Sequence, residues 1–119
     1  MSASPWVPVG VSDSRLHIFV DRHSVVSRGS IVEAVVRIGS PGLIAGRIAI
    51  VYELEQFDCG RRVWRLLRYR GVDGDHRPVA TRQPTVTRPF LRVLPGTIGE
   101  ATLDTVCTIA TRGPEATHR

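Results

Sequence analysis

Apolar and polar residues alternate along most of the first seventy positions, and this alternation predicts β-strands. Residues 7–11 and 16–20 carry apolar side chains at every second position with a polar turn between them, which predicts a hairpin. Residues 31–38 repeat the alternation, and residues 47–57 form the longest strand candidate. Residues 62–69 return after a short connection, so we expect antiparallel pairing with the preceding strand.

The remaining segments are less regular. Residues 21–30 form a turn-rich connection, and residues 71–89 are rich in glycine, proline, threonine and arginine. The second of these segments has room for one short edge strand, at 79–82. Residues 90–94 form a last short strand.

The C-terminal part predicts one helix. Thr97 and Glu100 have the spacing of a capping box, Arg112 suits the negative helix end, and Gly113 follows as a stop. One face of this helix carries an apolar stripe of Leu103, Val106, Cys107 and Ala110. The fold class is therefore α+β, with about six antiparallel strands and one C-terminal helix.

Size and composition fit one ordinary globular domain of 119 residues. Apolar residues make up 42% of the chain, and no stretch is long and apolar enough to span a membrane. All 16 basic residues are arginine, and the net charge is +5. The absence of lysine is typical of a GC-rich genome, and a basic chain favours an acidic partner.

No motif for catalysis or for metal binding is present, so we expect a protein without enzymatic activity, cofactor or metal. Glu53 and Glu55 resemble a paired carboxylate, but they are expected on a solvated strand face, paired with Arg61 or Arg65. The Asp73-Gly74-Asp75 sequence is expected to be a turn, because the later ligands of a calcium loop are missing.

The two cysteines, Cys59 and Cys107, are too few for a closed zinc site. They are either free thiols or one disulfide. A disulfide would imply an oxidising compartment, whereas the first residues show neither the basic region nor the apolar core of a signal peptide.

Several short sequences together resemble the surface-adhesin protein E family of Gram-negative bacteria. The resemblance covers residues 6–112, which we expect to form a single domain between flexible tails at 1–5 and 113–119. The matching residues are Trp6, Pro8, Val9, Gly10, Asp21, Ser24, Tyr52-Glu53, Phe57-Asp58-Cys59, Arg65-Leu66-Leu67, Pro95 to Glu100 and Val106-Cys107. Phe90 departs from the pattern, because family members often have tryptophan there.

This resemblance implies an antiparallel sheet to which a disulfide between Cys59 and Cys107 tethers the helix. It also implies an exported protein, periplasmic, on the outer-membrane surface or secreted, whose signal peptide was trimmed or is encoded upstream. The implied function is adhesin-like binding of a protein partner, such as a host extracellular-matrix protein. Two alternatives stay open: an arginine-rich module binding nucleic acid or anions, with nucleic acid the less favoured partner, and a structural envelope protein without a soluble ligand.

Strand alternation places the candidate binding residues. It sends Trp64 to the same face as three arginines of its strand, and the other arginines to the opposite face or to strand edges that keep the sheet soluble. The candidate partner-binding residues are Arg62, Trp64, Arg68, Arg70, Arg77 and Arg82.

A second surface follows from the longest strand candidate. If the helix covers the face that carries Cys59, an apolar row is left on the other face, because one helix cannot cover both. We therefore expect a homodimer, joined along an edge strand or across this row, whose residues are Ile48, Ile50, Tyr52 and Leu54.

Overall fold

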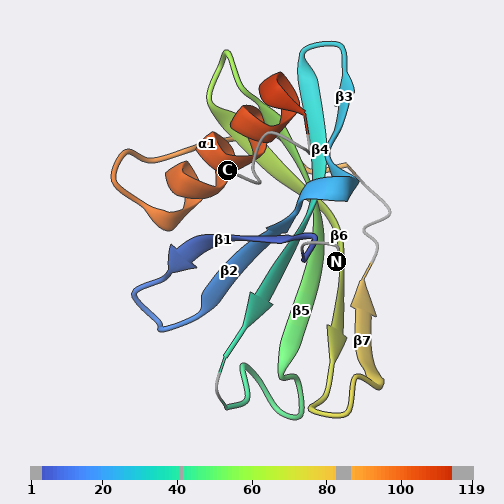
Figure 1. Ribbon diagram of the computed structural model, residues 1–119. Coiled ribbons are helices and arrows are strands. Elements are labelled where there is room, and N and C mark those ends of the chain that lie inside the picture. The colour runs from blue at the N-terminus through green and yellow to red at the C-terminus, as the bar shows by residue number, and fades with distance from the viewer. Residues whose placement is uncertain (1–3, 41, 83–86, 114–119) are drawn as a thin grey trace.

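A computed structural model describes residues 4–40, 42–82 and 87–113 of the chain. Within these residues the protein is one antiparallel sheet with a C-terminal helix (Figure 1). The strands are β1 (Trp6–Val11), β2 (His17–Asp21), β3 (Val26–Arg28), β4 (Ile31–Gly39), β5 (Ile50–Asp58), β6 (Val63–Val72), β7 (Pro78–Arg82) and β8 (Leu91–Arg92). A short 3-10 helix η1 (Arg22–Ser24) follows β2, and the helix is α1 (Ile98–Arg112). The predicted α+β class is confirmed, with eight strands in place of about six.

The main strand order is β1-β2-β4-β5-β6-β7. Two short strands lie off this path, because β3 pairs with β4 and β8 pairs with β6. The sequence prediction of a connection at residues 21–30 missed β3. All three residues of β3 are exposed, so this strand has no buried face and therefore no alternation to detect.

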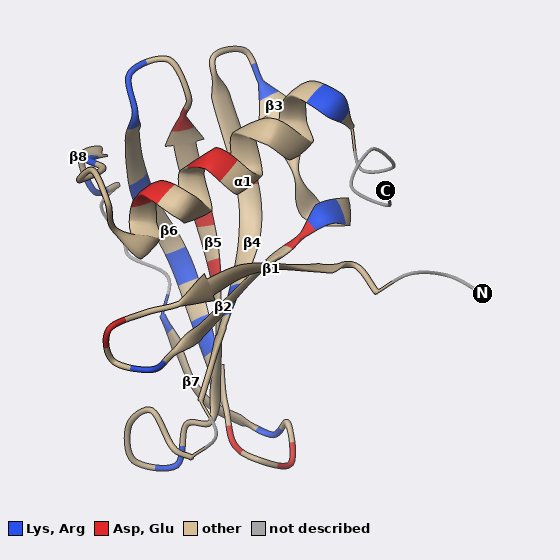
Figure 2. Ribbon diagram, turned by 60° about the vertical axis from the view of Figure 1, so that its left-hand side comes forward, with Lys and Arg blue, Asp and Glu red and all other residues tan. Residues whose placement is uncertain are grey.

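The core lies between α1 and one face of the sheet. Figure 2 shows the helix lying across the upper parts of β4, β5 and β6, while the lower parts of the strands extend beyond it. Alternate residues of β4 point toward the helix and are buried, as the sequence alternation predicts. The buried apolar side chains at this interface include Val20, Val32, Ala34, Val36, Phe57, Leu103, Val106 and Ile109.

A capping box starts the helix, as predicted. The Thr97 hydroxyl accepts a hydrogen bond from the Glu100 amide at 3.2 Å. The Glu100 carboxylate reaches back to the amide of Gly96 at 3.0 Å, one residue before the expected one. The bond from Gly96 lowers the pKa of Glu100 below its ordinary value, and a second bond from the Arg62 guanidinium lowers it further.

A disulfide also joins the helix to the sheet. Cys59 follows directly after β5 and is bonded to Cys107 in α1, with a Cα–Cα distance of 6.0 Å. The pairing that the family resemblance implied is therefore confirmed. The expected flexible tails at 1–5 and 113–119 lie mostly outside the described residues.

Candidate functional site

The helix covers only one face of the sheet and leaves the other face open. The register of β4 with β5 and of β5 with β6 shows which side chains share each face, because directly paired residues point the same way. Glu55 and Phe57 are buried on the helix side. Tyr52 and Leu54 alternate with them and point away from α1. We call the surface that carries Tyr52 and Leu54 the open face.

A row of aromatic and arginine side chains crosses the open face on neighbouring strands. Phe19 pairs with Arg37, Arg37 pairs with Tyr52, and Tyr52 pairs with Arg70. The Arg37 guanidinium lies 4.5 Å from the centre of the Phe19 ring and 4.4 Å from that of Trp6. We call these five residues, Trp6, Phe19, Arg37, Tyr52 and Arg70, the open-face cluster.

The cluster is held together by ring contacts. The Trp6 and Tyr52 ring centres are 5.9 Å apart and tilted by 41°, and the Arg70 guanidinium lies 5.0 Å from the centre of the Tyr52 ring. Cations and aromatic rings attract each other at these distances. These contacts therefore favour the observed positions of the Arg37 and Arg70 guanidinium groups on the sheet.

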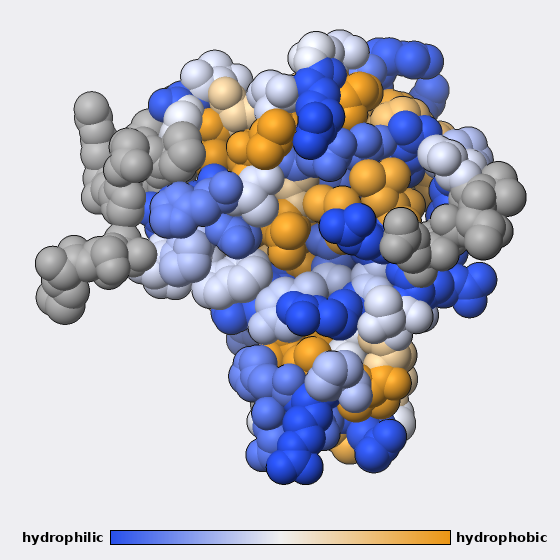
Figure 3. All heavy atoms as spheres, turned by 90° about the vertical axis from the view of Figure 1, so that its right-hand side faces the viewer, coloured by the Kyte–Doolittle hydropathy of each residue, from blue (hydrophilic) through white to orange (hydrophobic). Residues whose placement is uncertain are grey.

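The two arginines of the open-face cluster and the neighbouring Arg68 have no acidic partner among the described residues, whereas Arg28 at the upper end of this face pairs with Glu33. Among the described residues, Arg37, Arg68 and Arg70 form no ion pair. Beside them a hollow of about 360 Å³ is lined by residues that include Val35, Tyr52, Leu54 and Thr81. The side of the molecule opposite α1 carries hydrophobic patches separated by hydrophilic side chains (Figure 3), so it is a mixed surface and not a continuous apolar one.

The structure corrects the predicted faces of β6. Leu54 pairs with Arg68 whereas Glu55 pairs with Leu66, so Leu67 is an extra residue that forms a β-bulge. The bulge reverses the alternation after Leu67. Arg68 and Arg70 therefore share the open face with Tyr52, but Trp64, which pairs with Phe57, faces the helix.

The other candidate partner-binding arginines lie away from the open-face cluster. Arg62 lies in the turn after β5, where its guanidinium bonds the carboxylates of Glu100 and Asp104 at 3.1 Å each. Both bonds raise the pKa of Arg62, and the bond to Asp104 has the larger effect. Arg77 lies in the turn before β7, and Arg82 pairs with Tyr69 at the far end of that edge strand.

The predicted dimer face is partly rearranged. Ile50, Tyr52 and Leu54 share one face of β5, as expected. Ile48 does not join them: a Cβ on Gly71 would lie 3.0 Å from the Ile48 side chain. Gly71 pairs with Val51 and so belongs to the opposite face. Ile48 leaves the row because residues 45–48 form a tight turn before β5 begins. That these side chains form a dimer stays a prediction.

The prediction for the two glutamates was wrong. Glu55 is only 6% exposed on the helix side, and neither Arg61 nor Arg65 pairs with it among the described residues. Arg65 instead donates to the Gln56 side chain at 2.8 Å and lies over the Phe90 ring. Burial, a hydrogen bond to Glu53 and the charge of Glu53 all raise the pKa of Glu55 well above its ordinary value.

Sequence reasoning missed three members of the open-face cluster, Trp6, Phe19 and Arg37. Each one pairs across the sheet with another residue of its own face. The sequence does contain one signal for them: large aromatic and arginine side chains occupy the strand positions that alternate with buried positions. Only the strand register shows that these positions meet.

Together these features define a class: an antiparallel sheet, open on one face, with a disulfide-tethered C-terminal helix on the other. The fold is similar to that of Haemophilus influenzae protein E in its crystal form II, with a TM-score of 0.67 over 94% of each chain. The two sequences are 14% identical, so the likeness concerns the fold. No protein-family model and no curated protein matches the sequence. No helix of the described residues is long and apolar enough to cross a membrane.

Proposed function

We propose that this chain is an exported, non-enzymatic binding protein of the adhesin type, which contacts a protein partner through the open face. One observation carries the proposal: unneutralised arginines and large aromatic rings lie side by side on the face that the helix leaves uncovered. Tryptophan, tyrosine and arginine are the residues that most often dominate the binding energy of protein interfaces.

The charge of the open face selects the kind of partner. Arg37, Arg68 and Arg70 have no acidic partner among the described residues, so an acidic protein surface would supply complementary charge. The disulfide fits an extracellular or cell-envelope location, where thiols are oxidised. The fold likeness to protein E and the sequence resemblance support the adhesin role, with a host extracellular-matrix protein as one such partner.

Surface plasmon resonance with the immobilised, disulfide-intact chain and a panel of purified extracellular-matrix proteins tests this function. For any protein that binds, we expect the double variant Tyr52→Ala/Arg70→Ala to weaken affinity about tenfold or more, as truncation of central interface residues does. The matched control is Arg77→Ala/Arg82→Ala, which removes two exposed arginines outside the cluster. Two outcomes would contradict the proposal: equal loss of affinity in both double variants, or no binding to any protein of the panel.

Binding of single-stranded nucleic acid is the second candidate, since arginines and aromatic rings on a sheet also suit this ligand. The ring faces here are already covered by arginine, because guanidinium groups lie 4.4 to 5.0 Å from the ring centres of Trp6, Phe19 and Tyr52. Bases would have to displace them in order to stack. Fluorescence anisotropy with oligothymidine at increasing salt separates the candidates: tight binding that falls steeply with salt would favour nucleic acid.

A further inference from the structure

A second site lies on the other side of the sheet, between β5, β4 and the first turn of α1. A cavity of about 140 Å³ opens there, and its walls are almost entirely apolar. An apolar cavity of roughly 150 Å³ is large enough to hold benzene. The side chains that form its walls include Ile18, Val36, Ile38, Phe57, Trp64 and Ile98.

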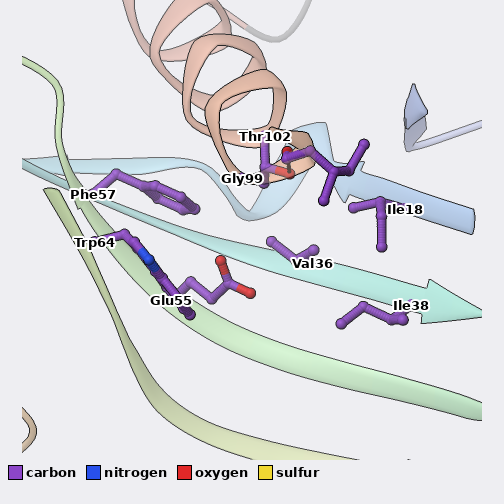
Figure 4. A pocket seen from close by; sticks show the side chains of 9 residues that line it. Ile18, Val36, Ile38, Glu55, Phe57, Trp64, Gly99 and Thr102 are labelled. Atoms are coloured by element: carbon purple, nitrogen blue, oxygen red, sulfur yellow. Dashed lines mark hydrogen bonds between the residues drawn. The ribbon is translucent and has the colours of Figure 1, made fainter. Parts of the chain in front are cut away.

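One carboxyl group points into this cavity. Figure 4 shows the Glu55 side chain extending from its strand into the space between the sheet and the helix. Its residue is 94% buried, since only 6% of its surface is exposed. The residues beside it in the sheet are Ala34 and Leu66, neither of which can form an ion pair.

No cationic side chain in the part of the chain that the structure describes pairs with this carboxyl group. Among the described residues, Glu55 forms no ion pair, and its one polar contact is with another acid, Glu53. On the facing helix, Glu100 and Asp104 are acidic and already share Arg62. A buried carboxylate without a counter-ion is costly, so the cavity is complementary to a ligand that brings a positive charge.

The walls select the rest of the ligand. Phe57 and Trp64 place two aromatic rings in the lining, and aromatic rings attract organic cations that have lost their water. The small volume excludes bulky groups. We propose that this cavity binds an alkyl- or arylammonium group, with the ammonium on Glu55 and the apolar body against Phe57 and Trp64.

This chemistry has two sources, a free amine and the lysine side chain of a protein. The site lies on the face opposite the open-face cluster, so the proposal is independent of the function proposed above. Because an ionised Glu55 is needed and burial raises its pKa, affinity is expected to rise with pH above the ordinary glutamate value of about 4.3. The other acidic group in contact with Glu55 is Glu53, and ionisation of this pair is coupled.

Titration of the isotope-labelled, disulfide-intact chain with benzylammonium, followed by backbone amide NMR shifts, tests the proposal. We expect shifts at Val36, Gly99 and Thr102, and affinity at least about tenfold higher than for benzyl alcohol, the neutral probe of the same size. Nα-acetyl-lysine methylamide forms the second arm. Preference for either ammonium probe over benzyl alcohol supports the site, and their relative affinities distinguish a free amine from a lysine side chain.

Three variants complete the test. Glu55→Gln should abolish the preference for the charged probe, while Glu33→Gln, the same change beside Arg28 on the other face, should preserve it. Ile38→Phe should fill the cavity and remove binding while Glu55 stays in place, so the site is testable even if Glu55→Gln does not fold. Equal affinity for charged and neutral probes, shifts centred on Tyr52 and Arg70, or full binding by Ile38→Phe would overturn the proposal.

Discussion

At the scale of single residues, the protein buries the acidic side chain of Glu55 in the apolar layer between the sheet and the helix. Glu55 lies beside Phe57 in the strand that contacts the helix. Removing a carboxylate from water favours its protonated form, and the neighbouring Glu53 acts in the same direction. A protonated Glu55 can donate to Glu53, which explains how two acids occupy one strand face.

This arrangement predicts how stability depends on pH. The pKa of Glu55 is raised in the folded chain, so the unfolded chain releases this proton first, near the ordinary value of about 4.3. The Glu55 contribution is fully present below that pH and is lost as pH rises through the folded pKa. We therefore expect Glu55→Gln to flatten the decline in the free energy of unfolding, measured by urea denaturation between about pH 5 and 8. The control variant Glu33→Gln should keep the decline, and an unchanged slope in Glu55→Gln would contradict this account.

A second residue-scale prediction concerns Arg62. Its two ion pairs connect the turn after β5 with the first turns of α1, and both are exposed to solvent. We expect Arg62→Gln to lower Tm at low salt and to have little effect at about 1 M salt, where exposed charges are screened. Arg61→Gln removes an adjacent arginine that forms no ion pair among the described residues. If both variants lower Tm equally, loss of these contacts is not the cause.

At the scale of elements, the helix is attached by three different means. A capping box defines its first turn, an apolar stripe buries Leu103, Val106 and Ile109 against the sheet, and a disulfide joins Cys107 to the end of β5. The disulfide lies near the middle of the helix, with the apolar stripe around it. Packing and the covalent bond therefore act on the same contact.

The contribution of the disulfide is measurable. The bonded residues are 48 positions apart, and in the chain-entropy model closing such a loop stabilises the fold by up to about 4 kcal/mol. We expect the double variant Cys59→Ala/Cys107→Ala to lose a large part of this stability in urea denaturation. Wild-type protein in reductant should lose a similar amount. A loss below about 1 kcal/mol would show that packing of α1 alone fixes the helix.

At the scale of the whole molecule, the sheet has one face covered by its own helix and one left for contacts. Ile50, Tyr52 and Leu54 belong to the uncovered face together with Arg68 and Arg70, which form no ion pair with any described residue. A second copy of the chain and a foreign partner would therefore compete for the same residues.

Dimer formation through this surface is testable by sedimentation equilibrium. We expect association at high micromolar concentration, and its loss in Leu54→Glu, because the new carboxylate would be buried between two copies. Leu94→Glu is the matched control, since Leu94 is exposed outside β5. A wild-type chain that stays monomeric over the whole range would reject the dimer.

The sequence was sufficient for much of the fold and for less of the site. Alternation located β1, β2, β4 and β5, and the capping box located the start of α1, because each depends on local periodicity. The burial of Glu55 had no local signal, since a carboxyl group reads as solvent-exposed. The open-face cluster depends on pairing between distant strands, which no single strand records. The bulge in β6 left one trace: Leu66 and Leu67 are consecutive apolar residues that interrupt the alternation.

That extra leucine has an effect far larger than its size. It turns Arg68 and Arg70 toward Tyr52, so one inserted position adds two positive charges to the side on which Arg37 already lies. Without this residue, strand alternation would direct Arg68 and Arg70 to the side that carries the helix and would leave Arg37 as the one arginine of the cluster still facing away from it.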